Sequence, residues 1–77
     1  MSLLENTDKI HTTQMGVGRI KRNLKLDTDD VVGYCISKIK DKNGKISRKG
    51  KNYYVEADGC IITVNASSYT IITAHLK

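Results

Sequence analysis

The sequence has no proline, tryptophan or phenylalanine, and its four tyrosines are the only aromatic side chains. Binders of single-stranded nucleic acid usually stack successive bases on several aromatic rings, so this composition gives that class little support. Two cysteines, Cys35 and Cys60, are too few for a disulfide framework, and no Cys/His cluster has zinc spacing. We therefore expect no metal and no cofactor, and we interpret both thiols as small core residues.

Long apolar runs are also missing. No apolar stretch approaches the roughly 20 residues of a membrane span. The N-terminus also lacks the long apolar region that is typical of a signal peptide. We therefore expect a soluble protein of the cytoplasm that makes no membrane contact. A chain of 77 residues is near the size at which burial only just offsets chain entropy. This predicts a single domain, residues 1–77, and excludes a large enzyme core with a deep pocket.

The second half of the chain has the pattern of an antiparallel sheet. Four runs are rich in β-branched and aromatic residues or follow a turn signal: Lys45–Lys49, Asn52–Ala57, Cys60–Asn65 and Tyr69–His75. They are separated by turn-forming segments: Asn43-Gly44 before the first run, then Gly50-Lys51, Asp58-Gly59 and Ala66-Ser67-Ser68. The pattern predicts a four-stranded meander over residues 45–77.

Neighbouring side chains on a strand point to opposite faces, so alternation predicts two different faces. The face predicted to be buried carries Cys60, Ile62, Val64, Ile72 and Ala74. The opposite face collects polar side chains: Tyr54, Thr63, Asn65, Tyr69, Thr73 and His75. Ile61 and Ile71 fall on that polar face, which favours a homodimer formed through the sheet. The alternative is an ordinary half-solvated antiparallel sheet.

Residues 1–40 have the pattern of a helical half that covers the apolar face. Helices are expected at residues 3–10 and 14–23, with Thr12 or Thr13 capping the second. A third helix is expected after Asp27 or Thr28 as its cap, with acidic side chains in its first turn. The predicted fold class is therefore α+β, with two or three N-terminal helices packed on one face of a four-stranded antiparallel meander.

The positive charge is strongly clustered. The net charge is +5, and seven of the thirteen Lys/Arg residues lie between Lys38 and Lys51. Four more form a second cluster: Arg19, Lys21, Arg22 and Lys25. Such clusters suit a polyanion, most simply a nucleic-acid backbone. The alternative is a solvated loop that lysine keeps soluble.

Two histidines, several basic residues and strand hydroxyl groups are the components of metal-independent RNA cleavage. That reaction needs a proton acceptor, a proton donor and cations around the phosphate, and histidine titrates near neutrality. The predicted catalytic residues are His11 and His75, and the predicted substrate-binding residues are Arg22, Arg48, Lys49, Lys51, Tyr69 and Thr73. Backbone N–H groups at Thr12-Thr13 could receive a phosphate at a helix start. The alternative for His11 is a cap or a local hydrogen bond.

Several segments resemble a family of short bacterial proteins catalogued as domain of unknown function 3781. They are Lys9–Thr13, Arg19–Leu24, Arg48–Val55, Ile61–Asn65 and Thr70–His75. More loosely, the layout resembles the barnase, EndoU, colicin and RelE group of small metal-independent RNases, in which a last strand reading like Ile71-Ile72-Thr73-Ala74 ends near the active site. The resemblance implies a toxin-type ribonuclease acting on RNA. The alternative is a non-catalytic module that binds nucleic acid or an acidic, antitoxin-like protein partner.

Overall fold

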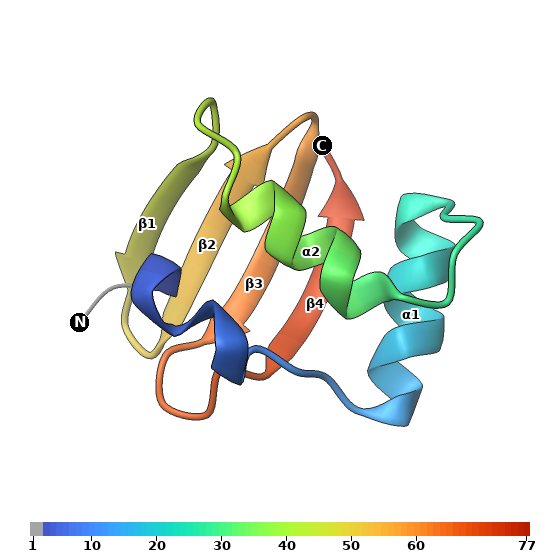
Figure 1. Cartoon of the computed structure of the whole chain (residues 1–77), viewed down its shortest axis with the longest axis horizontal. Helices are drawn as coiled ribbons and strands as arrows, with labels where there is room; N and C mark the ends of the chain where they lie inside the picture. Colours follow the sequence, from blue (N-terminus) through green and yellow to red (C-terminus); the bar gives the residue numbers. More distant parts are fainter. Residues whose placement is uncertain (1–2) are drawn as a thin grey trace.

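Helical segments come first and strands follow in the computed structural model, which describes residues 3–77 (Figure 1). The helical segments are the 3-10 helix η1 (Leu3–Lys9) and the α-helices α1 (Gln14–Leu24) and α2 (Val31–Ile39). The strands are β1 (Lys45–Lys49), β2 (Asn52–Ala57), β3 (Cys60–Asn65) and β4 (Ile71–Leu76). The predicted α+β class, with helices before strands, is confirmed.

The strands form one antiparallel meander in the order β1-β2-β3-β4. The bounds of β1, β2 and β3 are those that the sequence predicts. Asp58 and Gly59, which join β2 to β3, have φ of 51° and 76°, as a two-residue hairpin turn of type I′ requires. β4 begins two residues later than predicted, because Tyr69 has a φ of 58° and belongs to the turn.

The core lies between the helices and one face of the sheet. In Figure 1, α2 crosses in front of the strands, η1 lies in front of one end of the sheet, and α1 runs beside β4. Ile20, Val31 and Cys35 of the α-helices are fully buried against this face. The predicted burial is confirmed for Cys60, Ile62, Val64 and Ala74.

Because of a β-bulge in β4, the prediction was wrong for one core residue. Val64 pairs with Ile71 but Thr63 pairs with Thr73, so Ile72 is an extra residue without a partner on β3. Such a residue shifts the alternation of side chains by one position. Ile71 is therefore 2% exposed and belongs to the core, whereas Ile72 is 42% exposed. The homodimer prediction loses one of its two supports, because Ile71 does not lie on the polar face.

The helix caps agree with the sequence in one case and differ in the other. Thr13 caps α1, and its hydroxyl oxygen accepts a hydrogen bond from the Gly16 N–H at 3.0 Å. The cap of α2 is neither Asp27 nor Thr28 but Asp30, whose carboxylate accepts from the Gly33 N–H at 3.0 Å. The predicted acidic first turn is therefore absent, because the helix starts after the acidic cluster rather than within it.

Candidate functional site

The outer face of the sheet, meaning the strand side chains that point away from the helices, is mostly polar. Strand register assigns its members: Lys45, Ser47, Lys49, Asn52, Tyr54, Glu56, Ile61, Thr63, Asn65, Thr73 and His75. The segments α2 and η1 lie on the opposite face, and α1 lies beside the edge strand β4 (Figure 1). Thr63 of β3 and Thr73 of the edge strand β4 face each other, and Thr63 is only 7% exposed. One side of the sheet is therefore available for binding.

Part of the outer face is hollowed. A hollow of about 540 Å³ is lined by side chains from three neighbouring strands: Lys45, Ser47 and Lys49 of β1, Tyr54 and Glu56 of β2, and Ile61 of β3. Tyr54 and Ile61 supply apolar surface, and the two lysines lie at the two ends of β1. Clefts with mostly apolar walls and a few polar groups are typical of binding sites for small molecules and side groups.

Glu56 is the one carboxylate among the strand residues of the outer face. One of its oxygens lies 2.8 Å from the Lys77 ammonium nitrogen, and it pairs across the strands with Lys45. The hydrogen bond from Lys77, and then the charge of Lys77, lower the pKa of Glu56 below its usual value. Glu56 is therefore ionised at neutral pH and offers only hydrogen-bond acceptors to the hollow.

Four lysines near β1 have no ion-pair partner among residues 3–77: Lys40, Lys42, Lys49 and Lys51. All four are exposed, and they lie in the segment before β1, at its end and in the β1–β2 turn. Unpaired cations on a surface attract polyanions over the Debye length. The hairpin of β1 and β2 therefore forms the basic edge of the outer face.

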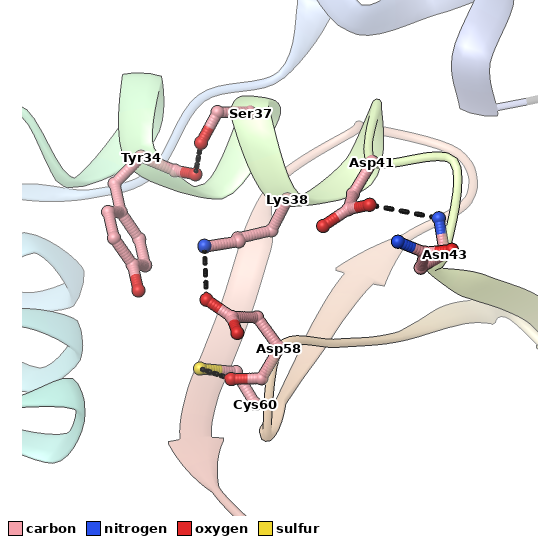
Figure 2. A network of polar contacts seen from close by, with 7 residues as sticks. All are labelled: Tyr34, Ser37, Lys38, Asp41, Asn43, Asp58 and Cys60. Atoms are coloured by element: carbon pink, nitrogen blue, oxygen red, sulfur yellow. Dashed lines mark hydrogen bonds and ion pairs between the residues drawn. The ribbon is translucent and has the colours of Figure 1, made fainter.

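Lys38 belongs to the same charge cluster in sequence but is neutralised in the structure. Its ammonium nitrogen lies 2.7 Å from a carboxylate oxygen of Asp58, in the β2–β3 turn, and 5.1 Å from the centre of the Tyr34 ring (Figure 2). The hydrogen bond to Asp58 raises the pKa of Lys38 and lowers the pKa of Asp58. The contact joins α2 to the sheet, so Lys38 is a structural cation rather than part of the basic edge.

His11 lies beside the start of β4, where it forms a parallel bridge with Thr70. Its Nδ1 is 2.9 Å from the Lys9 carbonyl oxygen, which can only accept, so Nδ1 carries a proton and donates. In the neutral ring Nε2 then accepts from the Thr70 hydroxyl at 3.1 Å. The Thr70 hydroxyl in turn lies 2.7 Å from that of Ser68. Both ring nitrogens have partners, which matches the local hydrogen-bonding alternative for His11.

The structure does not bring the two histidines together. His11 is bridged to Thr70, whereas His75 pairs with Ile61 five residues further along β4. At about 3.3 Å per residue, the two lie roughly 16 Å apart along the strand. His75 is exposed and shares the outer face with Glu56 and Ile61. A single phosphate cannot contact both imidazoles at this separation.

The structure does not gather the remaining predicted site residues into one place. Lys49 and Thr73 lie on the outer face, and Lys51 lies in the exposed β1–β2 turn. Arg48 and Tyr69 do not join them. Arg48 stacks 5.5 Å from the centre of the buried Tyr53 ring, and Tyr69 packs against the core with Lys9 5.9 Å from its ring centre.

Arg22 of α1 is further removed. Ile20 and Leu24 of the same helix are buried, so Arg22, two residues from each, projects from the exposed side. The predicted phosphate position at Thr12-Thr13 lies beside the start of β4, where the Thr12 hydroxyl donates to the Ile71 carbonyl at 3.0 Å. Arg22 and this helix start therefore lie apart from the outer face.

Five residues that line the hollow were not predicted as site residues from the sequence: Lys45, Ser47, Tyr54, Glu56 and Ile61. Alternation within Lys45–Lys49 could have identified the first two, because positions 45, 47 and 49 share one face. Glu56 could have been recognised as the acidic position that faces the same way as Tyr54.

No helix among residues 3–77 is long and apolar enough to cross a membrane.

Comparison with known proteins gives a family but no characterised relative. No curated protein matches the chain, and no solved structure matches it. A family model does match, over residues 4–75, and its description is "Protein of unknown function (DUF3781)". The resemblance to domain of unknown function 3781 is thus confirmed across nearly the whole chain, and the protein belongs to the DUF3781 family.

Proposed function

We propose that this protein binds RNA in the cytoplasm through the outer face of its sheet. The observation that carries the proposal is an open, mostly polar sheet face whose β1–β2 edge bears unpaired lysines. Lys49 and Lys51 have no anionic partner among residues 3–77, and Lys45 adds a third cation beside the hollow. An RNA backbone supplies the negative charge that this edge lacks, and strand hydroxyl and amide groups supply hydrogen bonds to bases or sugars.

The binding should depend on salt, because phosphate contacts release counterions. On single strands each neutralised phosphate adds roughly 0.7 to the slope of log affinity against log salt. Replacing Lys49 and Lys51 together with Gln should therefore flatten the slope by about 1.4. Both side chains are exposed, so the fold should hardly change.

The measurement is fluorescence anisotropy of a labelled single-stranded RNA over a range of salt concentrations. The matched control is Arg19→Gln with Lys25→Gln, which removes the same charge from exposed positions of α1 and its C-cap. The proposal requires that the variant with Lys49 and Lys51 replaced loses more RNA affinity than the control variant does. Equal losses of RNA affinity in the two variants would mean that only the net charge matters. An RNA affinity that does not change with salt concentration would indicate a protein partner instead.

A second candidate function, metal-independent RNA cleavage, rests on His11. Its Nδ1 proton is held by the Lys9 carbonyl, so Nε2 is the acceptor nitrogen of an exposed ring, and a substrate hydroxyl would replace the Thr70 hydroxyl as its partner. This role ranks second because His75 lies too far away to act as the acid on the same phosphate. Cleavage of total RNA in the presence of EDTA tests it. His11→Ala should lower the rate by about 10²- to 10⁴-fold if the ring transfers a proton. Absence of cleavage by the natural protein, or equal cleavage by both proteins, would exclude this role.

A further inference from the structure

We propose that the hollow of the outer face holds one unpaired guanine base of the bound RNA. This inference rests on the proposed RNA binding and deepens it. The hollow combines an aromatic ring, an aliphatic side chain, two lysines and an ionised carboxylate that pairs across the strands with one of them. Each of these groups restricts what the occupant can be.

The hollow itself does not suit a phosphate. Glu56 projects into it as an anion that accepts hydrogen bonds, and a phosphate next to it would be repelled. Tyr54 and Ile61 instead offer surface for one flat ring, because bases stack on tyrosine in sheet-based RNA sites. A single tyrosine in the hollow suits one base, not the series of stacked bases that the low aromatic content argues against. Lys49 lies roughly 13 Å from Lys45 along β1, at the end away from Glu56, and can contact a phosphate beside the base, whereas Lys45 pairs with Glu56 across the strands.

The carboxylate selects among the bases. Guanine is the base whose Watson–Crick edge presents two adjacent N–H donors, N1–H and the exocyclic N2–H. Adenine and cytosine place an acceptor nitrogen beside their amino group, and uracil has one N–H between two carbonyl groups. An acceptor-only group such as Glu56 therefore pairs best with guanine, and its ion pair with Lys77 at 2.8 Å fixes its position.

The same geometry selects single strands. In a duplex the Watson–Crick edge of guanine is paired with cytosine and both ring faces are stacked. A base in that state can reach neither Glu56 nor the Tyr54 ring. We therefore expect that a hairpin RNA binds through the lysines alone and shows no preference for guanine in its stem.

The test compares oligouridylates that carry one central guanine, inosine or adenine. Inosine lacks the exocyclic amino group, so the natural protein should bind the guanine RNA about tenfold more tightly than the inosine RNA. Glu56→Gln should remove this preference. Because that change also removes a negative charge, Asp8→Asn serves as control: it makes the same charge change at an exposed residue outside the sheet, and the preference should remain.

Tyr54→Leu supplies an independent variant, and we expect it to weaken binding of the guanine RNA about tenfold or more with little change in melting temperature. Equal affinity for all three RNAs, with salt-dependent binding retained, would overturn the guanine site and leave the proposed function standing. Retention of the preference by the Glu56 variant would do the same. Failure to bind any RNA would overturn both.

Discussion

Replacing Ile71 or Ile72 with valine tests the assignment of faces on which the candidate site depends. Valine keeps the β-branch, so strand propensity hardly changes, and each substitution removes one methylene group. Ile71 is 2% exposed and Ile72 is 42% exposed. Burial of a methylene contributes about 0.8 kcal/mol, and Ile→Val changes in cores cost about 0.5–1.5 kcal/mol. We expect a loss near 1 kcal/mol for Ile71→Val and below about 0.5 kcal/mol for Ile72→Val.

Urea denaturation followed by far-UV circular dichroism measures both losses, and thermal melting provides a second readout. In a domain of this size a loss of 1 kcal/mol lowers the melting temperature by about 4–8 °C. The alanine variants enlarge the contrast, because Ile71→Ala removes three buried carbons and should cost about 2–5 kcal/mol. A cost at Ile72 equal to or greater than that at Ile71 would refute the bulge and, with it, the membership of the outer face.

Three further predictions concern the helical half. Gly18→Ala should stabilise the protein by up to about 1 kcal/mol, because the added Cβ meets open space. Gly16→Ala should destabilise it, because the added Cβ would collide with the Thr12 hydroxyl. The midpoints of urea denaturation should therefore shift in opposite directions, and shifts in the same direction would contradict this. Asp30→Ala should cost α2 its cap and about 1 kcal/mol in the same assay, and an unchanged midpoint would contradict it. Burial raises the pKa of Cys35 to about 12, so this thiol stays protonated in the folded protein at pH 8. Cys35 should therefore react with a thiol reagent far more slowly in the folded protein than in the protein unfolded by urea. Equal reaction rates would contradict the burial of Cys35.

The linkage at Cys35 also sets a direction for stability at high pH. The raised pKa means that the folded state holds its proton while the unfolded state, with a thiol pKa near 9, has lost it. Stability should therefore be fully present below pH 9 and decline as the pH rises from there toward 12.

Local signals predicted most of the fold. β1, β2 and β3 have the predicted bounds because each is short, rich in strand-forming residues or alternating, and closed by a turn dipeptide. The type I′ turn at Asp58-Gly59 needs two positive φ values, and this pair of residues provides them at low cost. The cap of α2 was less predictable, since three aspartates in four residues can each cap a helix and the sequence does not distinguish them.

The features of the site that could not be predicted from the sequence depend on contacts between residues that are far apart in the chain. Lys38 is removed from the basic cluster by Asp58, which follows twenty residues later. His11 is held by Thr70, which is fifty-nine residues away. Neither partnership has a local signature, because an exposed lysine or histidine looks the same in sequence whether or not a partner approaches it. The charge cluster was visible in the sequence, but the subset of unpaired lysines was not.

The bulge in β4 explains why the predicted site divides into separate places. After the bulge the simple alternation holds, and Thr73 and His75 lie on the outer face as expected. Before the bulge the alternation is reversed, so Ile71 enters the core, while Tyr69 in the preceding turn also packs against it. Two adjacent isoleucines fit either register equally well, so the sequence cannot show where the extra residue lies. Together with the length of β4, this separates His75, beside the hollow, from His11, which is fixed at the other end of the strand. The separation therefore argues against cleavage of one phosphate by a pair of histidines, which is why RNA cleavage is the second of the two proposed functions.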